Sequence, residues 1–445
     1  MPRRTLAVTA GLLLLQQSAS SSSTSSGRAD SIPVDTTATT GEQAPIDREA
    51  VVRRHTFRVQ EPKLDIDSVI LSPLTVGNGE IGFTADVTGL QTLNSSLRVP
   101  DFPLYTLSNW GWHSPDPRDV GAKTDGFNQD GTLNYVYENV SILSADTRPG
   151  KGNRTVPYQF NCADYNDQGL CNYYHNFPAR VNLGQLSFVT ATTAATDNNT
   201  PQTETSASSS PLPPLQHVDP NGIVDVSQSL DMWTGTLYSN WSYNAGNTSS
   251  VDDHTEGPHP VQVVTAMDND TDTVAVRYTA PKTFPLGVQL SFCGLAQDGG
   301  ACSFGDDAFA HNTTVLHNAG GKLDLYRQNG RYDSYAVSCV VNSTGSDSLQ
   351  FRQTGPHSFV LWSDSSEAES SSSANDDTVV TDITCRYALV CCVGPEPATD
   401  PGALSRQAVP SFPLILTRTQ QAWETFWTSG AMVDIAGGTN LQNAQ

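Results

Sequence analysis

The chain has 445 residues, of which 24 are basic and 46 acidic, so its formal net charge is −22. A polyanion of this kind repels phosphate backbones, and no basic cluster offsets the charge, so no nucleic-acid partner is expected. The length would hold two or three ordinary domains, but an all-β sandwich often exceeds about 200 residues as one unit, so the domain count has to come from patterning.

The amino-terminal residues have the order of a secretory signal peptide. Arg3 and Arg4 precede an apolar run from Leu6 to Leu15, and small residues follow at positions 18–20. The run is too short to span a bilayer, and no later segment reaches that length. We predict a signal peptide over residues 1–20 and a disordered Ser/Thr-rich leader over 21–48. The protein is therefore expected to be secreted and extracellular, with no membrane partner once the signal is removed.

The sequons agree with this extracellular address. Asn-x-Ser/Thr triplets without a middle proline are acceptors for N-glycosylation in a secreted chain. The predicted glycosylation sites are Asn94, Asn139, Asn153, Asn198, Asn240, Asn247, Asn269, Asn312 and Asn342.

The eight cysteines are an even number, which favours disulfides in an oxidising compartment. Two local pairs are predicted, Cys162 with Cys171 and Cys293 with Cys302, because each would close a short loop. The pairing of the other four stays open, since eight cysteines allow 105 connectivities. These four are Cys339, Cys385, Cys391 and Cys392. Metal binding is the alternative, but neither C-x-x-C nor nearby histidines occur, so no metal or other cofactor is expected.

Short segments with strand patterning fill the region from residue 49 to 400, which we interpret as one β domain. Most are bounded by Gly, Pro, Asn or Asp, as in a large antiparallel sandwich, and no helical period runs through the region. Two polar excursions, 190–214 and 363–377, are interpreted as surface loops because strand patterning resumes after each. The predicted fold class is therefore all-β. The predicted strands are Val51–Val59, Glu80–Val87, Tyr135–Leu143, Leu183–Ala191, Ile223–Asp231, Thr236–Tyr243, Val261–Met267, Thr273–Thr279, Leu286–Phe292, Tyr332–Val341, Leu349–Arg352, Phe359–Trp362 and Val379–Val393.

The segment Ser72–Leu93 contains a clear strand between two turns. Apolar and polar residues alternate from Glu80 to Val87, and glycines flank the run. Within it, Glu80 and Asp86 are expected to hold turns by hydrogen bonding. Trp110, Trp112 and His113 follow downstream. Pattern alone favours burial of these three side chains, and the alternative is a loop that lines a sugar pocket, because aromatic faces beside a polar edge suit carbohydrate rings.

Near the end of the chain the period becomes helical. Apolar residues recur at helical spacing after Pro413, a residue suited to a first helical turn, and Gly430 can end the helix. The recurring residues are Leu416, Trp423, Phe426 and Trp427. A face with three aromatic side chains, each burying about 150–250 Å², needs another element to cover it.

Four strings resemble one protein family. LTVGNGEIGFTADVTGLQTL and PLYTLSNWGWHS resemble the amino-terminal region of six-hairpin glycosidase-like proteins related to glycoside hydrolase family 65, and SLDMWTGTLYSNW and AWETFWTSGAMVDIAGGT resemble the same family in the same order. The resemblance implies a β super-sandwich, then a linker helix and a truncated start of the next region over residues 401–445. The (α/α)6 barrel that holds the family's catalytic carboxylate would follow, and it is absent from this chain.

No residue of this sequence can be assigned to glycoside cleavage. Glycoside cleavage needs a carboxylic acid and either a second carboxylate or an anion such as phosphate. No Asp or Glu stands in a motif that sets it apart, and the family's acid lies in the barrel, so no catalytic residue is assigned. The G-x-S-x-G, phosphate-cradling glycine and H-E-x-x-H motifs are also missing from the sequence.

The first functional hypothesis is a secreted glycoside hydrolase-like protein of carbohydrate metabolism, present as its non-catalytic sandwich domain, with an oligosaccharide or glycan as partner. The alternatives are a non-catalytic carbohydrate-binding or cell-wall glycoprotein and a truncated product without activity. The sequence leaves open the sugar, the linkage, hydrolysis or phosphorolysis, and the oligomeric state. The residues predicted to face carbohydrate or barrel are Trp110, Trp112, His113 and Trp233.

Overall fold

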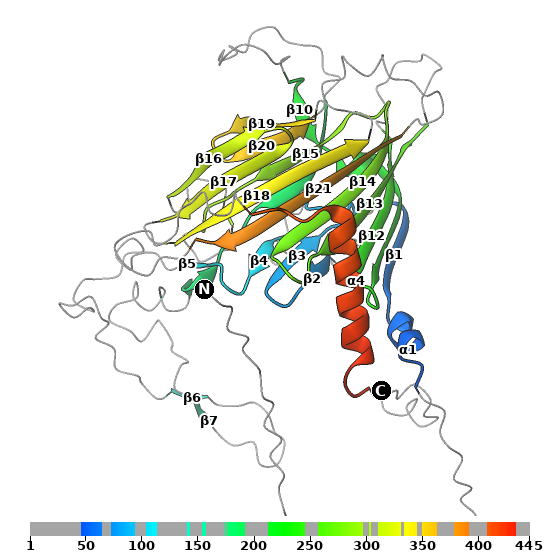
Figure 1. Cartoon of the computed structure of the whole chain (residues 1–445), viewed down its shortest axis with the longest axis vertical. Coiled ribbons are helices and arrows are strands. Elements are labelled where there is room, and N and C mark those ends of the chain that lie inside the picture. The colour runs from blue at the N-terminus through cyan, green and yellow to red at the C-terminus, as the bar shows by residue number, and fades with distance from the viewer. Residues whose placement is uncertain are drawn as a thin grey trace, which may run out of the picture. The chain divides into compact units, whose positions relative to one another are not determined.

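A nine-stranded antiparallel sheet is the largest element of the structure (Figure 1). It comes from a computed structural model that describes residues 46–64, 73–93, 104–113, 140–142, 154–156, 173, 176–191, 212–244, 257–296, 302–303, 310–330, 333–344, 349–362, 378–390 and 407–432. The chain divides into two units, Met1–Pro45 and Ile46–Gln445, and all described residues lie in the second. In spatial order the strands of the large sheet are β1 (Phe57–Lys63), β11 (Ile223–Asp231), β12 (Thr236–Tyr243), β13 (His259–Met267), β14 (Thr273–Pro281), β21 (Thr378–Leu389), β18 (Asp333–Thr344), β17 (Lys322–Asn329) and β16 (His311–Ala319).

A five-stranded antiparallel sheet packs against the large one. Its order is β10 (Leu215–His217), β9 (Gln185–Ala191), β15 (Leu286–Ser291), β20 (Ser358–Trp362) and β19 (Gln350–Gly355). Three smaller sheets are formed by β2 (Leu74–Gly77), β3 (Ile81–Ala85) and β4 (Thr106–Ser108), by β5 (Trp112–His113) with β8 (Ala179–Arg180), and by β6 (Val140–Ile142) with β7 (Arg154–Val156). A 3₁₀ turn, Pro220–Gly222, leads into β11.

The core lies between the two large sheets. Phe188 of β9 meets Trp241 of β12 with ring centroids 5.6 Å apart, and it meets Tyr278 of β14 edge-on at 5.5 Å. Alternate residues of β3 also enter this core, because Ile81, Phe83 and Ala85 are buried in the same cluster. The predicted all-β sandwich is confirmed, since period-two patterning turns one face of each strand inward.

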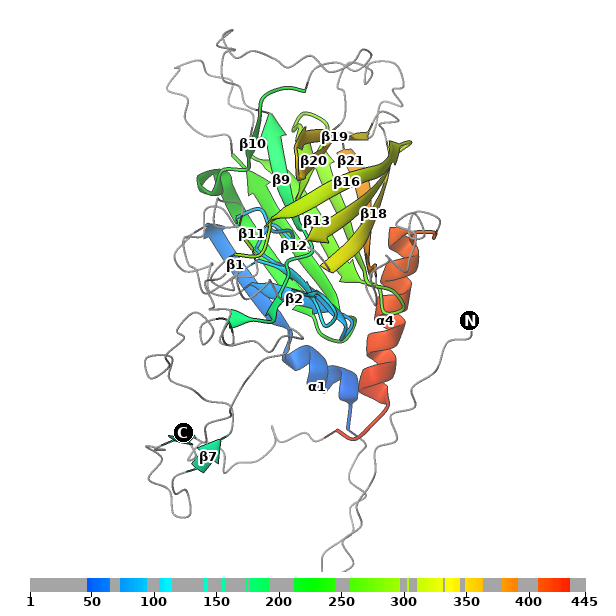
Figure 2. The same cartoon turned by 90° about the vertical axis from the view of Figure 1, so that its left-hand side faces the viewer.

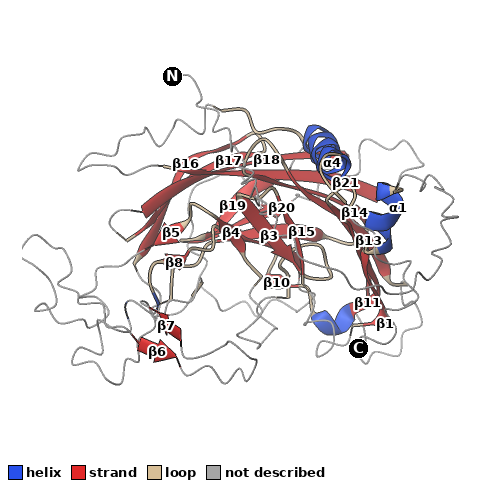
Figure 3. Ribbon diagram, turned by 90° about the horizontal axis from the view of Figure 1, so that it is seen from below, coloured by secondary structure: helices blue, strands red, loops and turns tan. Residues whose placement is uncertain are grey.

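Helix α4 (Phe412–Thr428) lies on the outer face of the large sheet (Figure 3). Phe412 and Ile415 are buried against Ala266 of β13 and Ala275 of β14. The helix begins one residue before the predicted Pro413, and Gly430 adopts a positive φ of 97° just after it ends. The predicted carboxy-terminal helix is therefore confirmed.

One member of the predicted apolar stripe is not covered within the described residues. Phe426 is 62% exposed. Figure 1 shows the reason, because the last turns of α4 extend past the ends of the sheet strands. Among the described elements, helix α1 (Arg48–Arg54) and the β11–β12 turn approach this end of α4 (Figure 2).

The prediction of a strand over Val51–Val59 is wrong in its first half. Residues Arg48–Arg54 form α1, and β1 begins at Phe57. Asp47 caps the helix by accepting a hydrogen bond from the Ala50 N–H at 3.0 Å, and Glu49 pairs with Arg53 one turn later. These local contacts outweigh the β propensity of the valines, of which Val52 alone is buried.

Several strands were missed by the sequence prediction, β16 and β17 among them. Strand β16 reads HNTTVLHNA and is exposed at most positions, so it lacks the alternation that marks a half-buried strand. Strand β17 buries Asp324 and Arg327 beside its apolar residues, which hides its inward face in the pattern. Both pair with strands that follow or precede them directly along the chain, β16 with β17 and β17 with β18.

Two cysteine pairs form disulfides among the described residues. Cys293 and Cys302, paired by the sequence prediction, have Cα atoms 5.3 Å apart. Cys339 and Cys385 were left open by the sequence, and the antiparallel register of β18 and β21 places them directly opposite each other with Cα atoms 4.1 Å apart. The remaining four, Cys162, Cys171, Cys391 and Cys392, lie outside the described residues.

Four of the predicted glycosylation sites lie among the described residues, and all four are exposed: Asn240, Asn269, Asn312 and Asn342. The other five, Asn94, Asn139, Asn153, Asn198 and Asn247, lie outside them. Neither α1 nor α4 has the length and apolar character to cross a bilayer, and the described residues contain no further α-helix of several turns.

Candidate functional site

The predicted aromatic group is divided by the structure into buried and exposed members. Trp110 follows β4 and is half-buried against the main core, and its indole Nε1 donates to Asp272 Oδ2 at 2.7 Å. Asp272 lies in the β13–β14 turn, which Asn78 also binds through its amide. Trp110 therefore ties its loop to this turn and is a structural residue.

Trp112 is the exposed member of the group. It is 42% exposed on the short strand β5, and its Nε1 donates to the carbonyl of Asn109 at 2.7 Å. The Arg180 guanidinium lies 4.7 Å from the centroid of the indole ring and donates to the carbonyl of Ser108. These contacts fix the orientation of an aromatic ring that remains partly in solvent.

His113 and Trp233 are both buried. The His113 ring packs on Gly330, where an added Cβ would lie 2.8 Å from the His113 Cε1 atom. Trp233 lies in the β11–β12 turn, and its backbone N–H donates to Asp231 Oδ1. This turn contacts α4, whereas Trp112 contacts β8, so Trp233 and Trp112 have different surroundings. Of the four predicted residues, Trp112 is the most exposed.

The carboxylate Asp86 holds a turn, as predicted. It is buried, its Oδ1 accepts hydrogen bonds from the Thr88 N–H and hydroxyl, and its Oδ2 accepts one from the Leu93 N–H at 2.7 Å. Burial raises the pKa of Asp86 to about 6, and these hydrogen bonds oppose the rise. At the preceding turn the side chain of Asn78, rather than that of Glu80, accepts the backbone N–H groups of Glu80 and Ile81.

The pKa of Asp86 predicts a pH dependence of stability. The pKa is higher in the folded state than the ordinary value of 3.8, so the contribution of this group is full below about pH 4 and is lost as the pH rises through 6. We expect the unfolding free energy of the wild type, relative to Asp86→Asn, to fall by roughly 2–3 kcal/mol between pH 4 and pH 7. Urea unfolding of both proteins across this range measures it, and parallel pH profiles would contradict the assignment.

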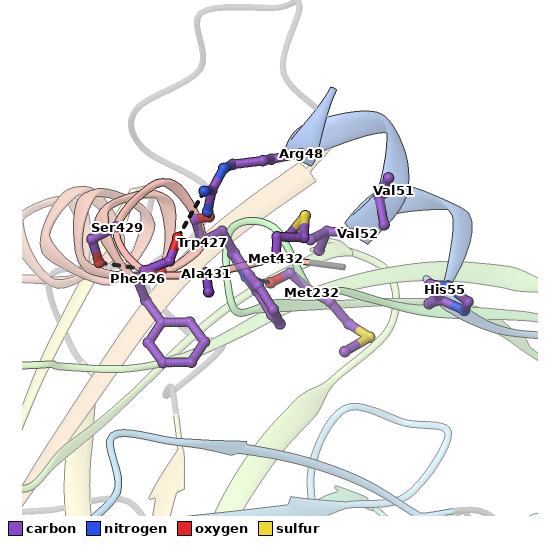
Figure 4. A pocket seen from close by; sticks show the side chains of 11 residues that line it. Arg48, Val51, Val52, His55, Met232, Phe426, Trp427, Ser429, Ala431 and Met432 are labelled. Atoms are coloured by element: carbon purple, nitrogen blue, oxygen red, sulfur yellow. Dashed lines mark hydrogen bonds between the residues drawn. The ribbon is translucent and has the colours of Figure 1, made fainter. Parts of the chain in front are cut away.

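A pocket that the sequence did not predict lies between α1, the end of α4 and the β11–β12 turn (Figure 4). It has a volume of about 560 Å³ and is lined mainly by apolar side chains, with Arg48, His55 and Ser429 as polar members. Phe426 and Trp427 supply its aromatic walls, and Met232 and Met432 lie beside Trp427, on the side away from Phe426.

Two arginines hold the walls of this pocket. Arg48 donates to the carbonyls of Trp427 at 2.9 Å and Gly430 at 2.7 Å, which are orphan acceptors at the end of α4. Arg53 donates to Asp231, the last residue of β11, at 2.7 Å. A sequence signal for this site was available only in part, because the aromatic stripe of α4 marks one wall and nothing marks its proximity to α1.

No group of three or more His, Cys, Asp or Glu side chains that could hold a metal ion occurs within the described ranges. The described residues of these sites offer hydrogen-bonding groups, charged groups and the indole face of Trp112. Such groups can bind a polar ligand, and we assign none of them a catalytic role.

The described residues define an all-β protein with two packed antiparallel sheets and an outer helix. No protein-family model matches the chain, and no curated protein matches it. Nineteen chains of solved structures match, among them "Putative kojibiose phosphorylase from human microbiome". That similarity has a sequence identity of 10% and a TM-score of 0.44, and it covers 83% of this chain. It covers 38% of the other chain, so the present chain spans well under half of the length of that protein.

Proposed function

We propose that this chain is a secreted, glycoside hydrolase-like protein of carbohydrate metabolism, and that its sandwich binds carbohydrate through the surface around Trp112. The resemblance of four ordered strings to one glycosidase-like family supports the proposal. The strings also meet in space, since the Trp241 indole donates to the Thr88 carbonyl and the Trp427 indole donates to that of Met232. We assign no catalytic residue to this chain. The substrate of a longer protein that contains such a sandwich remains a proposal.

The observation that carries the proposal is the exposed and fixed indole of Trp112. Sugar rings present C–H groups on their faces and hydroxyls at their edges, so they suit an aromatic face with polar neighbours. Trp112 offers such a face, with the guanidinium of Arg180 and the backbone carbonyl of Asn109 as its polar neighbours. Fixing the ring in advance lowers the entropy lost when a ligand binds.

A glycan panel tests the site. We expect Trp112→Ala to weaken the binding of a recognised glycan by about tenfold or more, because the stacking surface is lost. Trp112→Phe should retain part of the affinity. Isothermal titration calorimetry is suitable because it does not depend on tryptophan emission.

Phe426→Ala is the matched control, since Phe426 is also an exposed aromatic residue but lies at the pocket beside α4. It should leave glycan affinity unchanged. If Phe426→Ala weakens binding and Trp112→Ala does not, the carbohydrate site lies at that pocket and the assignment to Trp112 is wrong. No binding of any glycan by the wild type would remove the proposed function itself.

A further inference from the structure

Strand β16 forms one edge of the large sheet (Figure 1). Within the described ranges it pairs with β17 and with no other strand. Its nine residues, HNTTVLHNA, include no Lys, Arg, Asp, Glu or Pro. Val315 and Leu316 are each 39% exposed. An edge of this length and composition is a template for pairing with another strand.

The other edges of the two large sheets carry the features that prevent such pairing. Strand β1 contains Arg58, Glu61, Pro62 and Lys63. Strand β10 has three residues, and β19 contains Arg352 and a bulge before Gly355. Strand β16 has a bulge between Val315 and His317, but the five residues from His311 to Val315 pair without interruption. The first half of β16 is therefore the edge without a charge, a proline or a bulge.

Contacts from neighbouring strands hold this half of β16 in place. The buried Arg327 of β17 donates to the carbonyl of Asn312 at 3.2 Å and to the hydroxyl of Thr313. The Thr313 hydroxyl also lies 2.7 Å from His357 Nδ1. The strand is thus fixed as a regular edge.

Asn312 lies on this edge and heads the sequon Asn312-Thr313-Thr314. His311 and Thr313 both contact His357 on the inner side of the sheet. Because successive side chains of a strand alternate between faces, Asn312 and Thr314 point to the outer side, and both are exposed. A glycan on Asn312 would begin at the second residue of the strand. A partner strand would have to approach within about 4.8 Å of the backbone there.

We propose that β16 is a self-pairing edge of this protein and that an N-linked glycan on Asn312 keeps it closed. Without the glycan, two copies join their β16 strands in antiparallel fashion across a twofold axis, which an antiparallel edge satisfies with itself. Each copy carries a net charge of −22, so two copies approach most easily where the surface lacks charge, as at β16. The inference depends on the secretory route and is independent of sugar binding at Trp112.

Three substitutions at Thr314 distinguish the effect of the glycan on self-association from the effect of the strand edge itself. Thr314→Ser keeps the sequon, Thr314→Ala removes it and leaves Asn312 in place, and Thr314→Lys removes it and adds a charge to the edge. The full chain is produced in a glycosylating host, and intact mass spectrometry reports whether Asn312 is modified. We expect wild type and Thr314→Ser to be monomers, Thr314→Ala to sediment at about twice the monomer mass, and Thr314→Lys to return to the monomer by like-charge repulsion.

Asn240→Gln is the control, because it removes another exposed sequon, on β12, which is not an edge strand, and should leave the protein monomeric. A monomeric Thr314→Ala overturns the proposal. So does a wild type that is monomeric although Asn312 carries no glycan. Equal self-association of Thr314→Ala and Thr314→Lys would place the contact elsewhere and would also reject it.

Discussion

Replacing Trp241 by alanine is expected to lower the free energy of unfolding by about 3–5 kcal/mol. Trp241 of β12 is almost completely buried, its ring contacts Phe188 of the opposite sheet, and its Nε1 donates to the Thr88 carbonyl at 3.2 Å. Alanine would leave a cavity between the two sheets and an unpaired buried carbonyl. Urea unfolding followed by circular dichroism measures the loss without depending on tryptophan emission.

Trp241→Phe separates the two contributions, because it keeps an aromatic ring but removes the N–H donor. We expect a loss of about 1–3 kcal/mol. Trp112→Ala is the control for the type of substitution, since Trp112 is 42% exposed, and its loss should be below about 1 kcal/mol. Similar losses for Trp241→Ala and Trp112→Ala would show that Trp241 does not join the two sheets.

Gly235→Ala is expected to destabilise the protein by about 2–5 kcal/mol and to loosen the end of α4. Gly235 has a φ of 65°, and a Cβ added there would lie 2.0 Å from Trp423 Cδ1. The indole would have to move, although the adjacent Trp427 is held by its hydrogen bond to the Met232 carbonyl at 2.6 Å. Urea unfolding gives the global loss, and hydrogen exchange of the α4 amides reports the local one.

Gly320→Ala is a matched control for the energetic cost of placing alanine at a positive φ. Gly320 has a φ of 60°, close to that of Gly235, but an added Cβ there would meet nothing within 4 Å. Gly320→Ala should lower the free energy of unfolding only by the cost of the left-handed backbone conformation, about 1–2 kcal/mol. Hydrogen exchange of the α4 amides should not change. Equal effects of the two substitutions would mean that α4 does not pack on Gly235 as described.

The four strings quoted in the sequence analysis contain residues that join distant parts of the fold. Gly89 belongs to the first of the four strings, and its carbonyl accepts a hydrogen bond from Thr265 at 2.8 Å. Gly235 and Trp423 belong to the third and fourth strings and touch each other. The strings therefore contain residues that join strands, turns and α4. This is a structural reason for their residue types, and it is separate from any catalytic one.

The sequence by itself determined the all-β class, the strands β11 and β12 with their bounds, and the carboxy-terminal helix. These follow from periodicity, because a strand or helix with one buried face repeats its apolar residues at a fixed local interval. Strand β16 escaped this test, since no face of it is consistently buried.

Only the tertiary structure decided which of the candidate residues are exposed and which cysteines pair. Trp112 is exposed and His113 buried although they are adjacent, because one lies beside Arg180 and the other against Gly330. Cys339 and Cys385 pair because the β18–β21 register sets them opposite each other. The pocket beside α4 needs α1, which is far away in sequence. Such features depend on contacts between distant segments, and local periodicity carries no information about them.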